Sequence, residues 1–418
     1  MIKKPIFVAL SPNTQKDDIF LASKLLFQPW KWKRGKGLVF LEKELKKYLK
    51  TKYIFLFNSG RSALMAILDA LNIKKGDEIL VQAFTCNALI NPILKIKAKP
   101  VFVDIDETLN LDPKDLKKKI TPHSKAVIIQ HTFGYPAKIK EILKITKEYN
   151  LSLIEDCAHS LGAKYEGKFC GTFGKASFFS FGRDKVISSV FGGIAITNDD
   201  RVGENLKNFY QKLNFPSFFW IFQQLLHPIL INIFVFPAFC VHPFLGKIFL
   251  KFFQKISLLS KAVFDIEKKG GVAKYFPKKM PNALAILALN QFKKLEKFNY
   301  HRKKISQFYT ENLKEKFIFP FLKKIKNNLS PIYMRFPIFI SKNSSKIIKK
   351  AEKEKIFLKD GWQGSVILPP DTKTEKMRYI FGSCPFAEKI SKKIINLPTS
   401  PRISERDAKR IVNFLNEI

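Results

Sequence analysis

Short apolar runs that alternate with helical patterns constrain the fold of this chain more than any other feature. The runs lie at residues 54–57, 78–81, 101–104, 126–129 and 151–154, and a helical pattern follows each of the first four. Continuous apolar runs are typical of strands buried on both faces, and alternation with helices predicts right-handed crossovers between parallel strands. The sequence therefore predicts an α/β fold with a large, mostly parallel sheet.

The rest of the chain indicates a second, smaller domain. Residues 176–181 and 193–197 lie so close together in the sequence that we expect two antiparallel neighbouring strands there. A helix is expected over residues 282–298, and the remainder mixes strand and helix patterns. At 418 residues the chain is long enough for two domains. We predict a large domain over residues 1–270 and a small C-terminal α+β domain over residues 271–418.

The net charge of +39 is extreme and bears on the choice of partners. Only 10 of the 74 basic residues are Arg, whereas proteins that read bases and phosphates favour the bidentate fork of Arg. The sequence contains no helix-turn-helix, zinc-finger or RNA-recognition signature. We therefore expect no nucleic-acid partner.

The cysteines and the N-terminus bear on the cellular compartment. Five Cys residues are scattered without CxxC spacing, which favours a reducing cytoplasm and offers no metal site. The apolar stretch at residues 6–10 is too short for a secretory signal.

Residues 213–246 contain no Asp, Glu, Lys or Arg, which is exceptional in so charged a chain. Four prolines in this insertion predict that no uninterrupted stretch reaches the roughly 20 residues needed to span a bilayer. They are Pro216, Pro228, Pro237 and Pro243. The residues that follow at helical spacing are Lys247, Lys251 and Lys255. Two interpretations remain open: a hairpin over residues 213–255 at the inner face of the membrane, or a hydrophobic insertion buried in the core or in a dimer.

A primary amine, a carboxylate and a helix N-terminus stand out as candidate site residues. Lys185 follows an apolar strand, and Asp156 closes another strand 29 residues earlier, where parallel sheets bind ligands. Gly60, Arg61 and Ser62 open a helix whose free N–H groups favour a phosphate. Pyridoxal phosphate needs these three groups, because it has an aldehyde, a ring nitrogen and a phosphate. A surface Lys and a helix-capping Asp are the simpler alternatives.

Three longer segments strengthen this interpretation through their order and spacing. They cover residues 58–64, 154–163 and 178–199, and shorter matches continue to residues 397–399. Together they resemble the DegT/StrS-type sugar aminotransferases, which are fold type I enzymes dependent on pyridoxal phosphate. The resemblance covers about residues 35–418 except the uncharged insertion. It implies the same two-domain fold and a homodimer with sites near the subunit interface.

The resemblance also implies roles for individual residues. Lys185 would hold the cofactor aldehyde and move a proton, and Asp156 would pair with the ring nitrogen. His159 would lie near the ring, and Ser180 would bind the phosphate. Thr85 also matches a cofactor-site position of the family.

Two positions depart from the family pattern. Arg61 stands where Thr is usual, so its guanidinium would either strengthen phosphate binding or point to solvent. Cys86 stands where many relatives carry an aromatic residue that stacks on the cofactor. Either Cys86 packs there as a small apolar group or Phe84 supplies the stacking face.

The resemblance implies a transaminase that moves an amino group from an amino acid to a ketosugar. Glutamate is the donor in most relatives, and the acceptor is usually nucleotide-linked and serves the synthesis of cell-surface polysaccharides or other glycans. Two alternatives remain: a pyridoxamine-dependent sugar dehydratase of the same family, which lacks the lysine, or a catalytically silent, membrane-associated scaffold. The sugar, the aminated carbon and the choice between a nucleotide and a lipid carrier are not specified by the sequence.

Overall fold

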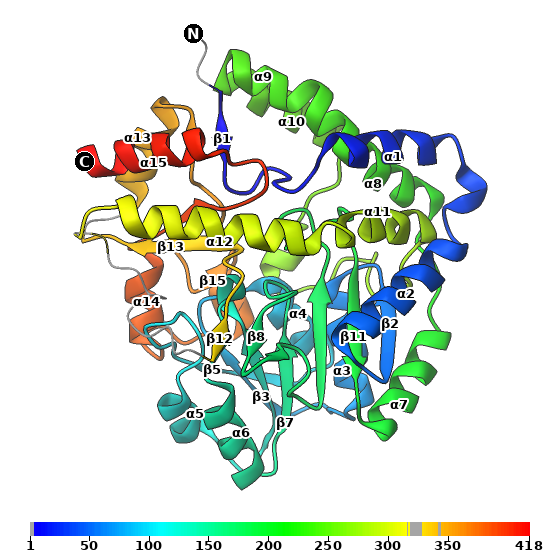
Figure 1. Cartoon of the computed structure of the whole chain (residues 1–418). Coiled ribbons are helices and arrows are strands. Elements are labelled where there is room, and N and C mark those ends of the chain that lie inside the picture. The colour runs from blue at the N-terminus through cyan, green and yellow to red at the C-terminus, as the bar shows by residue number, and fades with distance from the viewer. Residues whose placement is uncertain (1–3, 316, 318–327, 342–343) are drawn as a thin grey trace.

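A seven-stranded sheet forms the centre of the computed structural model, which describes residues 4–315, 317, 328–341 and 344–418 (Figure 1). The strand order is β2-β11-β10-β7-β6-β3-β5. The bounds are β2 (Tyr53–Phe57), β3 (Glu78–Gln82), β5 (Lys99–Val103), β6 (Ser124–Gln130), β7 (Ser152–Asp156), β10 (Ala176–Ser180) and β11 (Gly193–Thr197). All neighbours are parallel except β11, which is antiparallel to β10 and β2. The predicted parallel sheet and its antiparallel pair are both confirmed.

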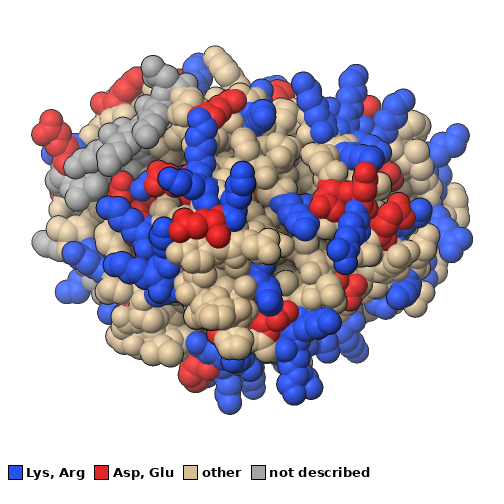
Figure 2. All heavy atoms as spheres, turned by 90° about the horizontal axis from the view of Figure 1, so that it is seen from below, with Lys and Arg blue, Asp and Glu red and all other residues tan. Residues whose placement is uncertain are grey.

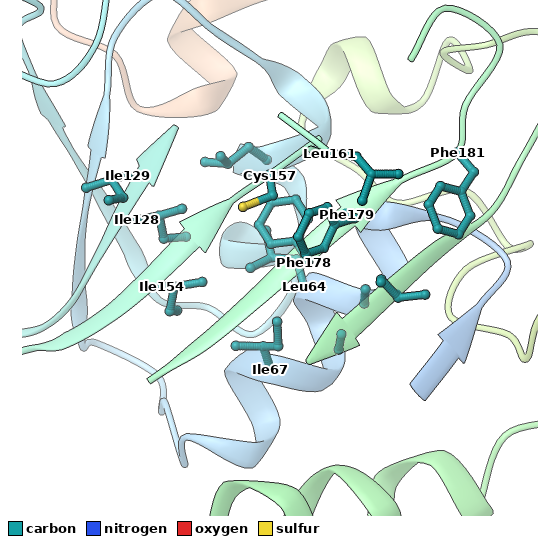
Figure 3. Close-up of a cluster of buried hydrophobic side chains, with 14 of the residues drawn as sticks. Leu64, Ile67, Ile128, Ile129, Ile154, Cys157, Leu161, Phe178, Phe179 and Phe181 are labelled. Carbon is teal, nitrogen blue, oxygen red and sulfur yellow. The ribbon is translucent and has the colours of Figure 1, made fainter. Parts of the chain in front are cut away.

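Helices connect these strands and cover the sheet. They are α2 (Lys36–Leu49), α3 (Gly60–Ala70), α4 (Asn87–Lys95), α5 (Pro113–Lys119), α6 (Ile139–Glu148) and α7 (Asp200–Gln211). Figure 3 shows Leu64 and Ile67 of α3 packing beneath Ile154 of β7 and Phe179 of β10. All four side chains are at most 1% exposed. Each such buried side chain stabilises the fold by roughly 1.5–3 kcal/mol. This packing against α3 stabilises the positions of β7 and β10.

The C-terminal part begins with two helices instead of the single one predicted over residues 282–298. Helix α11 (Asn282–Phe292) ends before α12 (Leu295–Asn312) begins. At the junction, Lys294 forms ion pairs with Asp17 and Asp18 of helix α1 (Lys16–Leu26). The expected continuous helix was wrong because the chain turns at a lysine that the N-terminal arm holds in place.

A small sheet and three α-helices follow in the described residues after 312. Strands β13 (Arg335–Phe339) and β16 (Ile394–Pro398) are antiparallel, and the helices are α13 (Ser344–Lys353), α14 (Pro385–Ser391) and α15 (Glu405–Glu417). A separate hydrophobic cluster joins side chains of α12, α15 and these two strands. Strand β1 (Ile6–Phe7) pairs with β14 (Ile356–Phe357), so the N-terminal arm reaches this part of the molecule. The domain boundary near residue 270 stays a prediction.

The uncharged insertion is helical throughout most of its length. Helix α8 (Phe218–Leu230), a π-helical turn (Ile231–Val235) and α9 (Phe236–Val241) form one helix of 24 residues, whose most apolar window has a mean hydropathy of 1.8. It is long and apolar enough to cross a membrane, although half of its most apolar window is buried in the protein. The expectation that prolines interrupt this stretch was therefore wrong. The π-helical turn follows Pro228, whose carbonyl accepts a 2.6 Å hydrogen bond from Asn232.

A further helix, α10 (Pro243–Lys255), follows after His242 and carries the three lysines at the predicted helical spacing. Basic residues are also spread widely elsewhere. Figure 2 shows Lys and Arg side chains across the whole face seen from below, with smaller groups of Asp and Glu between them. On this face the charge is diffuse and is not gathered into one stripe.

Candidate active site

A cavity of about 540 Å³ opens where β7 and β10 end. Its wall includes side chains from both of these strands, from the N-terminus of α3 and from the C-terminal part of the chain. Seven of the nine residues predicted from the sequence line it: Gly60, Arg61, Cys86, Asp156, His159, Ser180 and Lys185. The structure therefore brings the amine, the carboxylate and the helix N-terminus into one space.

Lys185 and His159 are in direct contact in this cavity. The Nζ atom of Lys185 lies 2.9 Å from Nε2 of His159, while Nδ1 of His159 accepts a 3.4 Å hydrogen bond from the Phe133 amide. With Nδ1 engaged by the amide, Nε2 is the ring atom that faces the amine. Burial, reinforced by the nearby Lys185 and Arg335 charges, holds the pKa of His159 well below its ordinary value. The imidazole is thus neutral and holds the Lys185 amine in place through this contact.

Asp156 is a buried carboxyl group on the cavity wall. It is the last residue of β7 and accepts a 2.9 Å hydrogen bond from the Ala158 amide. Burial raises its pKa to about 6, although the Ala158 bond and the charge of Lys185 act in the opposite direction. A cation placed beside it would favour the carboxylate, so the site is suited to a protonated ring nitrogen.

The N-terminus of α3 faces Ser180 at the other end of the cavity. A Cβ atom on Gly60 would lie 3.1 Å from Cβ of Ser180, and one on Gly193 would lie 2.5 Å from the Gly60 amide nitrogen. Glycine at residue 193 therefore lets α3 approach the sheet closely. Ser59, which the sequence reasoning missed, also lines the cavity and caps the helix through Ser62. Helix N-termini with free amides bind phosphate.

Two predicted cofactor-binding residues do not line the cavity. The Ser62 hydroxyl donates a 2.7 Å hydrogen bond to Asn58, and the Thr85 hydroxyl donates a 2.9 Å bond to Gln130. Both side chains are fully buried. Gln130 itself lines the cavity, so Thr85 contacts a residue of the cavity wall without reaching the cavity.

An ion network from the C-terminal part supports the lysine. Arg335 is buried, and its guanidinium lies 2.7 Å from both Asp184 and Asp360. Burial opposes the charged form of Asp184, but Lys185 and Arg335 hold its pKa below the ordinary value. Both carboxylates line the cavity. Sequence reasoning missed this network, because its partners are far apart in the chain and no local motif joins them.

Residues that are far from Lys185 in the sequence hold the backbone around it through hydrogen bonds. The Arg302 guanidinium donates hydrogen bonds of 2.7 Å to the Val186 carbonyl and 2.8 Å to Asn13. Asn13 donates in turn to the carbonyls of Lys185 and Val186. The N-terminal arm and α12 thus fix the loop that carries the lysine.

One buried cluster resembles a metal site in composition. His131, Glu155 and Cys157 bring potential ligand atoms within 4.8 Å of one another. The Glu155 carboxylate, however, already accepts 2.7 Å hydrogen bonds from the amides of residues 171, 173 and 174 and contacts His131 at 3.1 Å. These bonds account for the buried carboxylate, so we interpret the cluster as structural.

Comparison with known proteins identifies the family to which this chain belongs. The model of the DegT/DnrJ/EryC1/StrS aminotransferase family matches residues 13–213 and 261–416. This chain belongs to that family. The family assignment confirms the predicted aminotransferase and its cofactor, pyridoxal phosphate. Residues 214–260, which include all but the first residue of the uncharged insertion, lie outside the matched segments.

Individual relatives agree with this assignment. The GDP-perosamine synthase of Escherichia coli O157:H7 is 36% identical over 188 residues, 45% of this chain and 52% of that enzyme. The chain thus matches about half the length of that synthase. The dTDP-3-amino-3,6-dideoxy-alpha-D-galactopyranose transaminase of Aneurinibacillus thermoaerophilus is 26% identical over 90% of this chain and 88% of its own length. Helicobacter pylori PseC, an aminotransferase involved in pseudoaminic acid biosynthesis, aligns over 99% of each chain with a TM-score of 0.74 and 21% identity, which confirms the fold.

Arg61 departs from the family pattern. Its side chain does not point to solvent, because it is held by an ion pair and a hydrogen bond. Its Nε atom lies 2.8 Å from the Glu267 carboxylate, and Nη2 donates a 2.9 Å bond to the Ala262 carbonyl. Glu267 has a fully buried side chain. Arg61 therefore joins the first turn of α3 to the segment that follows the insertion.

The second departure from the family pattern is Cys86, which stands where many relatives carry an aromatic residue. Cys86 lines the cavity and caps α4, whereas Phe84 is fully buried behind Trp362 at a ring distance of 5.4 Å. Trp362 reaches the cavity wall and lies edge-on to the His159 ring, 5.1 Å away. Sequence reasoning missed Trp362, which comes from the distant C-terminal part.

The residues present fit pyridoxal phosphate. Lys185 offers an amine for the aldehyde, and Asp156 offers a carboxyl whose raised pKa would fall beside a cationic ring nitrogen. The start of α3 and Ser180 offer N–H and hydroxyl donors to the phosphate. The assignment of each residue to its part of the cofactor remains a prediction.

Proposed function

We propose that this enzyme transfers an amino group from an amino acid to a nucleotide-linked ketosugar, with glutamate as the donor. The observation that carries the proposal is the placement of Lys185 and Asp156 on the wall of one cavity with the N-terminus of α3. The printed names of the GDP-perosamine synthase and the dTDP-sugar transaminase support a nucleotide carrier. The product would serve the synthesis of a cell-surface polysaccharide or another glycan.

The residues of the chain divide the work between them. When bound, pyridoxal phosphate supplies an electron sink for the carbon that loses its proton. Asp156 keeps the ring nitrogen protonated, and Lys185 takes and returns the proton at the substrate carbon. His159 orients Lys185 through its 2.9 Å contact. Trp362 lines the cavity beside His159.

Lys185 favours transamination over the dehydratase alternative, since those dehydratases lack this lysine. The intact pair of Lys185 and Asp156 likewise opposes a silent scaffold.

We also infer a homodimer, as is usual in the family. Exposed apolar side chains on and near α1 and α2 offer a face for a second copy: Phe20, Phe27, Trp30, Val39 and Phe40. Light scattering of the purified enzyme will give its mass in solution.

The cofactor bond provides the direct test. The purified enzyme should absorb at about 330–430 nm, and borohydride should abolish the band and leave a reduced adduct on Lys185. Lys185→Arg should show no adduct, whereas Lys125→Arg, at an exposed position, should behave like the wild type. Glutamate and a panel of nucleotide-linked ketosugars will then identify the acceptor. An adduct without any amine transfer to the panel would overturn the proposed acceptor class.

A further inference from the structure

Helix α10 exposes a continuous apolar face. Six large apolar residues on α10 and just after it are between 37% and 64% exposed. They are Phe244, Leu245, Ile248, Phe249, Phe252 and Ile256, and we refer to them as the α10 stripe. Their spacing of one, three or four residues places them along one side of the helix. An exposed apolar surface of this kind marks an interaction site on most proteins.

The opposite side of α10 is already packed against the protein. Gly246 lies so close to Phe239 of α9 that a Cβ atom would come within 2.2 Å of the ring. Phe239 and Phe253 are 5% and 8% exposed and belong to a hydrophobic cluster that includes Phe7 and Phe357. Helix α10 therefore has two distinct sides. One side is buried and anchors the helix to the protein, and the other carries the exposed α10 stripe.

A row of lysines runs beside the α10 stripe. Lys247, Lys251 and Lys255 are exposed and lie four residues apart. Lys247 pairs with Glu352, and no Asp or Glu occurs in the sequence between Glu204 and Asp265. A surface that joins large apolar side chains to lysines, without carboxylates of its own, complements an anionic lipid surface.

We propose that the α10 stripe docks in the headgroup region of an anionic lipid bilayer, with the helix parallel to the membrane plane. A transmembrane arrangement of Phe218–Val241 does not fit, because half of its most apolar window is buried against the rest of the protein. A symmetric contact between two copies would bring their lysine rows towards each other. The segment also lies outside the residues that match the family model.

Docking would place the cavity beside the bilayer. Gln254 of α10 and Lys261 both line the cavity, so its rim begins where the α10 stripe ends. The Ser260 hydroxyl, next to this rim, donates a 2.8 Å bond to Gln224 of α8 and accepts one of 2.5 Å from Arg183. The proposal concerns binding alone and does not depend on the proposed acceptor.

Vesicle flotation of the full-length holoenzyme tests the docking. The wild type should float with vesicles of phosphatidylglycerol and phosphatidylcholine and bind phosphatidylcholine alone at least tenfold more weakly. Phe244→Ser with Phe252→Ser should reduce binding to the anionic vesicles at least tenfold, because two exposed phenyl groups are lost. The matched control, Ile380→Ser with Phe381→Ser, removes two side chains that are 75% and 78% exposed elsewhere and should bind like the wild type.

Two further measurements separate the contributions. Lys251→Gln with Lys255→Gln should lower binding about tenfold on anionic vesicles and leave binding to phosphatidylcholine unchanged. Phe249→Trp should gain fluorescence that brominated lipids quench beyond the wild-type level. Failure of the holoenzyme to float would overturn the proposal. So would a Phe244/Phe252 variant that binds vesicles normally but changes its mass by light scattering, because the stripe would then be an interface between copies.

Discussion

The Nζ atom of Lys185 lies 2.9 Å from the Nε2 atom of His159, in a cavity whose burial keeps the imidazole neutral. His159 stacks on Phe133 at a ring distance of 5.7 Å and a plane angle of 10°. The ring is therefore fixed on one face and presents its Nε2 atom to the amine. This relationship makes His159 a positioning residue for Lys185.

Replacing His159 by Phe should keep the stacking and remove the hydrogen bond. We expect kcat to fall by about 10- to 100-fold, because the amine is no longer oriented for proton transfer. The cofactor spectrum should persist. His123→Phe, at an exposed position, serves as the control. Because the pKa of His159 is far below its ordinary value, the pH–rate profile of the wild type should show no step near pH 6.5 that this variant removes. An unchanged kcat in His159→Phe would refute the positioning role.

Asp156→Asn should stabilise the cofactor-free enzyme. The folded pKa of Asp156 is raised to about 6 by burial, so the folded state holds a proton that the unfolded chain has lost above about pH 4. Stability thus falls as pH rises from about 4 to about 6. The variant should gain up to about 3 kcal/mol at pH 8 and roughly half of that at pH 5.

Urea unfolding of the apoenzyme at the two pH values checks this expectation, and cofactor titration of the same variant should show a loss of affinity. Asp69→Asn, on the exposed side of α3, is the control for a change of charge. A gain in stability that does not depend on pH would mean that the Asp156 carboxyl is not the titrating group.

Sequence reasoning located the residues whose position follows from a neighbouring strand. Asp156 and Ser180 are the last residues of buried strands, and Gly60 begins a helix just after another. Since parallel strands end at a common edge, their meeting could be predicted from order alone. Lys185 was a candidate from its place after a strand, but its role depended on the family resemblance, because its loop has no regular structure that would fix its direction.

Other parts of the site could not be predicted because they depend on contacts between distant segments. Trp362 and Arg335 reach the cavity from the C-terminal part, and no local pattern distinguishes them there. Ser62 and Thr85 share the motifs of the site but turn inward to Asn58 and Gln130. The expectation for the insertion was wrong for another reason: the helix continues through Pro228 and Pro237, with a π-helical turn between them.

Arg302→Met should loosen the loop that carries Lys185. Arg302 is 1% exposed, and its guanidinium donates to the Val186 carbonyl and to Asn13. Methionine keeps much of the apolar stem but leaves these acceptors with fewer donors, at a cost of about 2–4 kcal/mol. Urea unfolding measures the loss, and cofactor titration should show weaker binding. Arg201→Met, on an exposed face, is the control. Full cofactor affinity in a destabilised Arg302→Met would show that Arg302 supports the fold without shaping the site.

The Arg61–Glu267 pair separates two roles for the arginine at the start of α3. Arg61→Thr restores the residue usual in the family but leaves a buried carboxylate unpaired, which should cost about 3 kcal/mol at pH 8. The cost should be smaller at pH 5, because burial already raises the pKa of Glu267 and protonation removes its charge. Arg61→Thr with Glu267→Gln should recover most of the loss in a double-mutant cycle.

Cofactor titration of the double variant then decides what Arg61 does. If the ion pair only joins α3 to the segment after the insertion, the double variant should bind pyridoxal phosphate within about threefold of the wild type, since the α3 amides and Ser180 remain. A loss of tenfold or more, with stability restored, would instead make the guanidinium a phosphate ligand. Because the single and double variants differ in stability but share the same missing guanidinium, the comparison separates folding from binding.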